Sequence, residues 1–183
     1  MDPEVGRLTG DDVGPGRFPE TQVIISNFDH MTGHKQDLLG KKVLITAGGT
    51  REAIDPVRFI GNRSSGKQGV ALAKAARDRG AQVQLIAANC DVADLKGIDV
   101  IEVETTSQMQ NALQSHFDQC NILIMSAAVA DARPSHVAQE KIKKASLSSI
   151  ELEANPDLLV EIAARKSTQI LVGFAAETKD HLQ

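Results

Sequence analysis

The chain has 183 residues, of which 42% are hydrophobic and 24% are charged, as is typical of one globular domain with a short addition. The net charge of −4 argues against nucleic acid and membrane surfaces as partners, since both are bound by clustered positive charge. We expect no signal peptide and no membrane span, and two cysteines cannot build a disulfide framework, so we expect a cytoplasmic protein.

Residues 1–40 differ from the rest of the chain. Glycines, prolines and acids alternate over residues 10–20, and a short mixed run and a polar connector follow up to Gly40. This segment is too short to bury a core by itself. We expect a flap, an arm or a short helix that ends a preceding domain, followed by a linker. A second domain is expected over residues 41–183. It is expected to be truncated, because the pattern stops where another helix should begin.

From Lys41 onward, apolar runs that predict strands alternate with helical patterns. Strands are predicted over 42–46, 82–88, 99–104, 121–125 and 169–173, and helices over 64–79, 106–117 and 155–166. For the last helix, Asn155 is the expected N-cap and Pro156 the first residue. Alternating strands and helices predict an α/β, Rossmann-like three-layer domain with a mainly parallel sheet. Alternation over 148–153 predicts an inserted β arm at the ligand-binding edge.

The polar, glycine-rich stretch over residues 48–69 lies between the first strand and the first helix. Such a connection normally has about 2–6 residues, so its length favours a functional loop. Small residues and a helix start suit a phosphate, and Arg58, Arg63 and Asn62 offer polar contacts. The alternative is a solvated loop with ordinary surface charges.

Two further groups could carry chemistry. Asp131 follows the fourth strand, where a carboxylate could hold Mg²⁺ or a ribose hydroxyl; the alternative is a turn-forming aspartate. Lys141 and Lys143 are expected on one face of the arm and, with Lys144, either face an anionic nucleotide or form a solvated charge run.

Several common motifs are absent from the sequence. Residues 65–69 lack the spacing of a Walker motif, and there is no clear G-x-G-x-x-G. The five histidines lack metal-ligand spacing. Neither Cys90 nor Cys120 has a histidine near it in a motif, so both are expected to be structural. The residues alone predict an anion-binding α/β domain that handles a nucleotide.

Several segments together resemble phosphopantothenate-cysteine ligase in their order and spacing, and the combination is highly specific. They are Thr46–Glu52, Ile54–Arg58, Asn62–Gly69, Ala127–Asp131, Lys141–Lys144, Asn155–Asp157 and Gly173–Thr178.

The resemblance implies a CTP-dependent ligase of coenzyme A biosynthesis with two chemical steps. The carboxylate of 4′-phosphopantothenate takes the cytidylyl group of CTP and pyrophosphate leaves. The amine of cysteine then attacks the acyl-cytidylate and expels CMP. Mg²⁺ is expected to offset the triphosphate charge. Related eukaryotic enzymes can use ATP, and the sequence does not decide between the nucleotides.

The resemblance also implies roles for individual residues. Asn62 is expected to hold the acyl-cytidylate, and Lys141 is expected to act in catalysis and nucleotide binding. Arg58 is a candidate for the substrate phosphate or carboxylate, chiefly on its chemistry, and Asp131 is a candidate metal ligand. The expected nucleotide-binding positions are Met125, Ser126, Ala127, Asp131, Lys141, Pro156, Asp157, Leu158, Leu159 and Phe174.

In bacteria this ligase is usually the second half of a bifunctional protein. Its first half is an FMN-dependent decarboxylase, whose end residues 12–20 resemble. Thr9–Asp12 stand where that half has an essential cysteine, so no decarboxylation and no FMN are expected here. The family forms homodimers, or higher oligomers when joined to a full decarboxylase half, and its arm helps cover the partner's site.

Two other functions stay open. An NAD(P)-dependent oxidoreductase would share the Rossmann-like fold, but it calls for a tight glycine-rich turn. A non-catalytic, dimerising nucleotide-binding fragment is the other, and CTP binding without pyrophosphate release would identify it.

Overall fold

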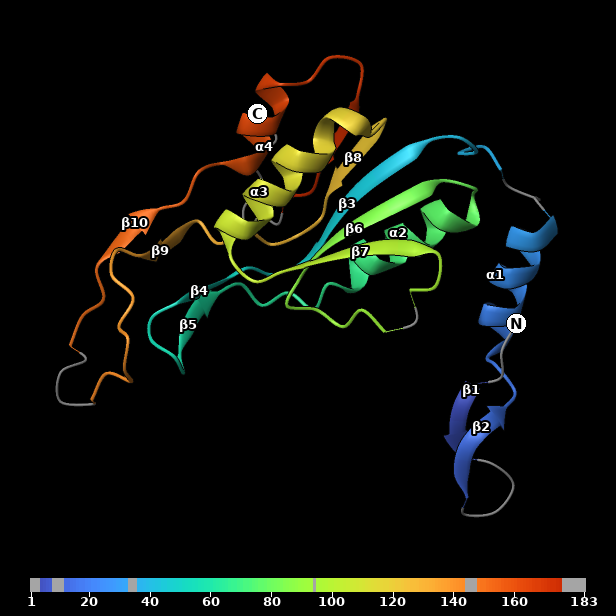
Figure 1. Ribbon diagram of the computed structural model, residues 1–183, viewed down its shortest axis with the longest axis horizontal. Coiled ribbons are helices and arrows are strands. Elements are labelled where there is room, and N and C mark those ends of the chain that lie inside the picture. Colours follow the sequence, from blue (N-terminus) through green and yellow to red (C-terminus); the bar gives the residue numbers. More distant parts are fainter. Residues whose placement is uncertain (1–3, 8–11, 33–35, 94, 144–147, 176–183) are drawn as a thin grey trace.

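The computed structural model describes residues 4–7, 12–32, 36–93, 95–143 and 148–175 (Figure 1). Its centre is a sheet of five strands, and neighbouring strands all pair in parallel. In chain order the strands are β3 (Lys42–Gly48), β6 (Gln82–Ala88), β7 (Ile98–Val103), β8 (Ile122–Met125) and β11 (Ile170–Gly173). The predicted α/β class and all five predicted strands are confirmed, with ends that differ by a residue or two.

The order of the strands is that of a doubly wound sheet. The first strand, β3, lies at the centre, with β6 and then β7 on one side and β8 and then β11 on the other. The chain therefore builds outward from β3 in one direction and returns to build outward in the other. Sheets of this kind bind ligands beyond the carboxyl ends of the strands where the direction changes, here between β3 and β8.

Helices cover both faces of the sheet and complete three layers (Figure 1). Since alternate residues of a strand point to opposite faces, Val43 and Ile45 of β3 share a core with α2 (Lys67–Asp78). Leu44 points to the other face, toward α3 (Thr106–His116), the 3-10 turn η1 (Phe117–Gln119) and α4 (Leu158–Ala164). Burial on both faces explains why β3 reads as a continuous apolar run.

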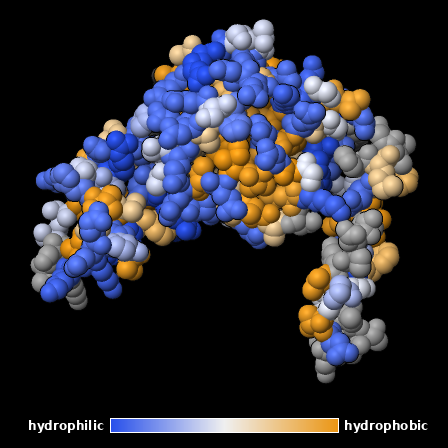
Figure 2. All heavy atoms as spheres, viewed as in Figure 1, coloured by the Kyte–Doolittle hydropathy of each residue, from blue (hydrophilic) through white to orange (hydrophobic). Residues whose placement is uncertain are grey.

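The molecular surface follows the same plan. In the view of Figure 1, hydrophobic residues gather at the middle of the molecule, where the sheet lies, with mostly hydrophilic residues around them (Figure 2).

Among the described helices, none has both the length and the apolar character needed to cross a bilayer.

The amino-terminal segment forms a hairpin of β1 (Glu4–Arg7) and β2 (Val13–Arg17) and a helix, α1 (Thr21–Thr32). It extends away from the sheet in Figure 1, and α1 contacts α2 through a hydrogen bond between Ser26 and Asp78. Val13 and Phe18 remain largely exposed. The short helix was one of the expected forms, and the exposure agrees with a segment that buries no core of its own.

Two antiparallel hairpins project from the carboxyl edge of the sheet. The long loop after β3 folds into β4 (Arg51–Ala53) and β5 (Phe59–Gly61), which the sequence did not predict. The inserted arm is confirmed as β9 (Ala132–Pro134) paired with β10 (Leu152–Ala154). The strand expected over 148–153 was misplaced, because only residues 152–154 pair with β9.

Two helix starts also differ from the expectation. Helix α2 begins at Lys67, after Gly66 in the left-handed region at φ 74°. Helix α4 begins at Leu158, and its N-cap is Asp157, whose side chain accepts a hydrogen bond from the backbone N–H of Val160. The prediction that Asn155 caps this helix was wrong, because its side chain is bonded elsewhere.

Candidate functional site

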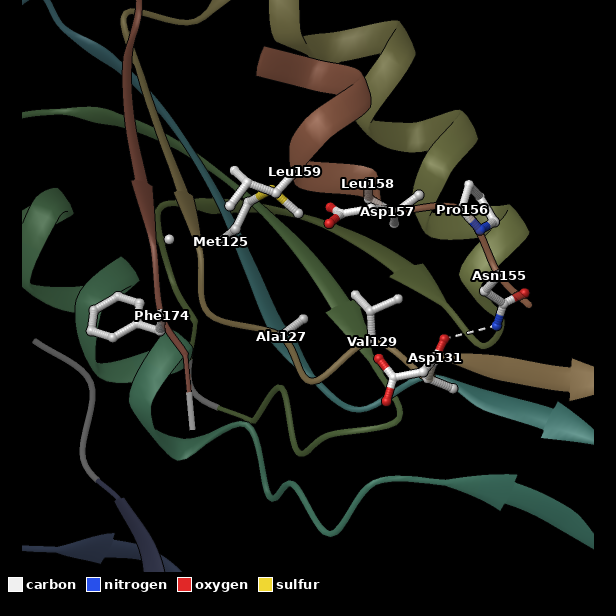
Figure 3. A pocket seen from close by; sticks show the side chains of 12 residues that line it. Met125, Ala127, Val129, Asp131, Asn155, Pro156, Asp157, Leu158, Leu159 and Phe174 are labelled. Atoms are coloured by element: carbon white, nitrogen blue, oxygen red, sulfur yellow. Dashed lines mark hydrogen bonds between the residues drawn. The ribbon is translucent and has the colours of Figure 1, made fainter. Parts of the chain in front are cut away.

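An open cavity of about 350 Å³ lies beyond the carboxyl ends of β8 and β11, beside the start of α4 (Figure 3). One wall is the segment that leaves β8, the other is the segment that enters α4, and the end of β11 closes a side. The lining residues are Met125, Ala127, Val129, Ala130, Asp131, Asn155, Pro156, Asp157, Leu158, Leu159, Gly173 and Phe174. The pocket therefore adjoins the point where the order of the sheet changes direction.

The wall that follows β8 is held in place by hydrogen bonds to β3. Thr46 is fully buried, and its hydroxyl oxygen accepts hydrogen bonds from the backbone N–H groups of Ser126 and Ala127, both at 3.1 Å. The backbone of Gly49 forms a parallel bridge with Ala128. The Ser126 hydroxyl is buried and has no hydrogen-bond partner among the described residues. This wall is therefore held to Thr46 and Gly49 through its main chain.

The other wall is anchored by α4. Leu158 and Ile162 are buried against the core under α3, and Asp157 occupies one N–H group of the first turn. The expectation that Pro156 is the first residue of this helix was wrong, since the first helical residue is Leu158. Pro156 and Leu159 still line the cavity.

Asp131 is the acidic side chain of the first wall. It is exposed, and within the described part of the chain no hydrogen bond or ion pair to its carboxylate is found. No group of three or more metal-binding side chains occurs among the described residues. Mg²⁺ on a nucleotide is usually held by one or two carboxylates together with phosphates and water, and Asp131 fits that need.

Asn62 lies next to the pocket without lining it. Its side-chain amide donates a hydrogen bond of 3.0 Å to the carbonyl of Val129, which is a lining residue. The loop between β5 and α2 is therefore tied to the first wall. Lys141 is exposed and does not line this cavity. Lys144 and residues 176–178 lie outside the described residues.

Arg58 is placed away from the pocket, in a cluster with Asp55. Its guanidinium donates to the Asp55 carboxylate and, at 3.0 Å, to the carbonyl of Ile142. A contact between Arg58 and the substrate would therefore compete with these bonds. The cluster joins the turn of the β4–β5 hairpin to the segment that carries Lys141.

Asp55 is almost fully buried, at 2% exposure, and is surrounded by donors. Besides Arg58, the backbone N–H groups of Val57, Arg58 and Ile142 donate to it at 2.9, 2.9 and 3.2 Å. The Arg58 side chain, followed by these N–H groups, holds the pKa of the Asp55 carboxyl well below its usual range, against the opposing effect of burial. Asp55 is therefore a structural anion.

We expect Asp55→Asn to reduce stability in a pH-dependent way. A lowered folded-state pKa means that the ionised carboxylate stabilises the fold above its unfolded pKa of about 3.9 and stops doing so as the pH falls toward the folded value. The difference in urea midpoint between the parent and Asp55→Asn should be largest at pH 5 to 7 and should become smaller below about pH 4. Asp118→Asn, at an exposed ion pair with Arg165, is the control. A difference in urea midpoint that stays constant down to pH 2.5 would contradict the lowered pKa of Asp55.

The two cysteines do not belong to this site. Burial raises the pKa of the thiols of Cys90 and Cys120, so neither is a ready nucleophile, and neither lines the cavity.

Eight of the ten residues expected to bind the nucleotide line the pocket, while Ser126 and Lys141 do not. Four lining residues were missed as site residues: Val129, Ala130, Asn155 and Gly173. Val129 and Ala130 lie between two expected positions, Ala127 and Asp131, and Gly173 ends β11 directly before the expected Phe174. Their positions in the sequence could therefore have identified them as lining residues. Asn155 carried the wrong signal, that of a helix cap.

Comparison with known proteins adds a family match. Residues 38–183 match the family described as the C-terminal domain of the DNA/pantothenate metabolism flavoprotein (DFP). The chain is 47% identical to the coenzyme A biosynthesis bifunctional protein CoaBC of Mycolicibacterium smegmatis over 193 aligned residues. That alignment covers 98% of this chain and 47% of the relative, so the chain spans about half the length of the curated relatives it matches.

Two solved structures are also similar. A crystal structure of the C-terminal domain of CoaBC matches with a TM-score of 0.70 and 41% identity, over 79% of this chain and 69% of that one. A mutant of Cab2 in complex with phosphopantothenate-cysteine matches with a TM-score of 0.61 over 84% of this chain and 70% of that one. Its identity is 19%, so this second likeness shows the fold alone.

Proposed function

The chain belongs to the DFP family, the C-terminal domain of the DNA/pantothenate metabolism flavoprotein, and from this premise we propose that it is the phosphopantothenate-cysteine ligase unit of coenzyme A biosynthesis. The observation that carries the proposal is the pocket, in which eight residues expected to bind a nucleotide come together. The similarity to CoaBC proteins supports the same reaction. As a metabolic enzyme it is expected in the cytoplasm.

The proposed reaction has two steps at one site. A carboxylate resists attack by an amine, so its oxygen first attacks the α-phosphorus of CTP and displaces pyrophosphate. The amine of cysteine then attacks the activated acyl carbon, and CMP leaves with the electron pair of the broken carbon–oxygen bond. The products are 4′-phosphopantothenoylcysteine, CMP and pyrophosphate. ATP is the alternative nucleotide, and the test below compares the two.

The residues of the pocket have separate tasks in this proposal. The apolar side chains of Met125, Leu159 and Phe174 offer a surface for the base or sugar. Asp131 would hold Mg²⁺ or a ribose hydroxyl, and the ion would supply charge neutralisation for the triphosphate. Asn62, tied to the wall at Val129, would hold the acyl-cytidylate for attack by cysteine.

Lys141 fits the proposal through a homodimer. It is exposed on the segment that leads to β10 and does not line the pocket of its own chain. Val137 and Leu152, on the same arm, are exposed apolar residues that a second copy would cover. We therefore propose that the arm covers the partner's site and that Lys141 acts there. Joined to a decarboxylase half, the dimer would form a larger assembly.

An oxidoreductase that uses NAD(P) is not favoured, although it would share the strand order. In place of a tight glycine-rich turn, the loop after β3 carries the β4–β5 hairpin.

The test is pyrophosphate release by the chain with 4′-phosphopantothenate, Mg²⁺ and either CTP or ATP, with and without cysteine. We expect release with CTP, and CMP once cysteine is added. Lys141→Gln should lower kcat by about 100-fold, as is usual when a group that stabilises developing charge is removed. The matched control is Lys166→Gln, an exposed lysine after α4 that does not line the pocket, which should stay near the parent value. Absence of release with both nucleotides, from protein with a cooperative thermal transition, would refute the activity.

A further inference from the structure

The side chain of Asn155 bridges the two walls of the pocket (Figure 3). Its Nδ2 group donates to the carbonyl of Ala130 at 2.8 Å, and its backbone N–H donates to the carbonyl of Asp131 at 2.8 Å. Pro156 and Asp157, which follow it directly, belong to the other wall. A single residue therefore sets the spacing between the segment after β8 and the segment before α4.

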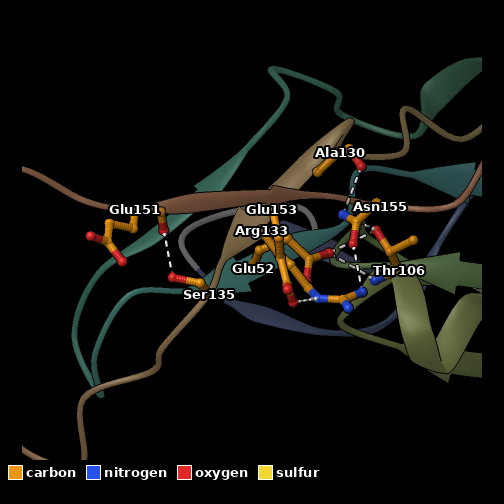
Figure 4. Close-up of polar contacts among 8 residues, drawn as sticks. All are labelled: Glu52, Thr106, Ala130, Arg133, Ser135, Glu151, Glu153 and Asn155. Carbon is orange, nitrogen blue, oxygen red and sulfur yellow. Dashed lines mark hydrogen bonds and ion pairs between the residues drawn. The ribbon is translucent and has the colours of Figure 1, made fainter.

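Buried polar side chains support this bridge from behind (Figure 4). Glu52 of β4 is 5% exposed, and its carboxylate accepts hydrogen bonds from the backbone N–H and the hydroxyl of Thr106, at 2.8 and 2.7 Å. Thr106 is the first residue of α3. The Nδ2 group of Asn155 donates to the Thr106 hydroxyl oxygen at 3.3 Å.

The carboxylate fixes the direction of every hydrogen bond in this network. Glu52 accepts from both the backbone N–H and the hydroxyl of Thr106, so the one proton of that hydroxyl is used on Glu52. The hydroxyl of Thr50, 3.1 Å away, therefore donates to Thr106 and is left to accept from the N–H of Ala130 at 2.9 Å. Asn155 must then present its amide nitrogen to Thr106, as it does. Each of these four side chains is thus hydrogen-bonded within the network.

The outcome is a clamp on the main chain at Ala130 and Asp131. Thr50 holds the N–H of Ala130, while Asn155 holds the carbonyls of both Ala130 and Asp131. Arg133 adds a link to the arm, because it donates to Asn155 Oδ1 at 3.0 Å and to Glu153 of β10 at 2.7 Å. The Asp131 carboxylate itself is left open to the pocket.

We propose that Asn155 is a positioning residue, which aims the Asp131 carboxylate into the pocket by holding its main chain against the network of Glu52, Thr106 and Thr50. It acts through Asp131 and does not itself touch the reacting atoms. The effect on nucleotide use rests on the proposed function, whereas the effect on the Ala130–Asp131 peptide does not.

The test compares Asn155→Asp with a matched substitution at Asn89. Aspartate has the shape of asparagine but cannot donate, so Asn155→Asp should set a carboxylate oxygen against the carbonyl of Ala130. Asn89 also donates to two main-chain carbonyls, those of Gly49 and Glu104, and it lies outside the pocket. Asn89→Asp thus removes the same kind of bridge elsewhere. Asn155→Ala serves if Asn155→Asp does not fold.

Two readouts are needed on the full chain. Amide hydrogen exchange should rise over residues 126–131 in Asn155→Asp and not in Asn89→Asp. With Mg²⁺ and CTP, the kcat/KM for the nucleotide should fall by about 10- to 100-fold in Asn155→Asp, as misplacement of a positioned group does, with little change in the KM for cysteine. In Asn89→Asp, the kcat/KM for the nucleotide should stay within about twofold of the parent value, even if the thermal midpoint falls as much as in Asn155→Asp.

The outcomes separate the two proposals. Equal exchange over 126–131 in both variants would overturn the positioning role, and so would equal kinetics in both variants of an active enzyme. Selective exchange in a parent chain that shows no turnover would support the positioning role and count against the ligase activity alone.

Discussion

Replacing Asp131 by asparagine is expected to lower the kcat/KM for the nucleotide by about 10- to 100-fold, the loss that accompanies removal of a contact to a charged group. The carbonyl of Asp131 is held by Asn155, and the preceding residue, Ala130, is held by Asn155 and Thr50. The carboxylate of Asp131 faces the pocket (Figure 3), and within the described residues it has no partner of its own. Its charge therefore contributes nothing to an internal ion pair, so the thermal midpoint should stay close to that of the parent. Initial rates at varied CTP and Mg²⁺ provide the measurement.

The Mg²⁺ dependence identifies what Asp131 does. If the carboxylate holds the ion, higher Mg²⁺ should restore part of the lost rate, and if it binds a ribose hydroxyl, Mg²⁺ should have no such effect. Asp99→Asn is the control, because Asp99 is the second residue of β7 and lies outside this pocket, where it accepts a hydrogen bond from Gln84. A rate unchanged by Asp131→Asn would remove Asp131 from the nucleotide site.

Replacing Gly48 by alanine is expected to destabilise the fold by about 2–5 kcal/mol, the sum of a strained backbone and an overpacked core. Gly48 ends the central strand with φ at 86°, a region that residues with a side chain rarely adopt. A Cβ at this position would lie 1.9 Å from the carbonyl oxygen of Ala88 on the neighbouring strand β6. Backbone on backbone cannot move aside cheaply, so the end of β3 would have to shift.

Urea denaturation measures this loss, and Gly40→Ala is the matched control. Gly40 has a similar φ of 74°, but a Cβ there would meet nothing within 4 Å. Its substitution should cost only the backbone strain, about 1–2 kcal/mol. The difference between the variants isolates the clash with Ala88. Equal losses would mean that β3 and β6 are further apart than the structure has them.

Much of the fold could be predicted from the sequence because strands and helices leave local patterns. The apolar run after Lys42 marks a strand buried on both faces, and the spacing of Met109 and Leu113 marks the buried side of α3. The two strands of the β4–β5 hairpin, each of three residues, were too short to give such a pattern. They were therefore interpreted as an open loop.

The cap of α4 shows where local rules mislead. Asn155 followed by Pro156 is a good helix-start signal, yet Asp157 is an equally good cap two residues later. The amide of Asn155 is taken instead by Ala130 and Thr106, which lie 25 and 49 residues earlier in the chain. Only the fold brings these partners together.

Local patterns in the sequence predicted the alternation of strands and helices, and the motifs identified eight of the twelve residues of one pocket before any of them could be placed. The tertiary structure alone decided which groups meet: Arg58 with Asp55, Asn62 with Val129, and Asn155 with Glu52 through Thr106. Periodicity is a local property, because each residue's face follows from its neighbours along the chain. Pairing of polar groups is not local, because a buried donor takes whichever acceptor the packed sheet and helices bring within reach.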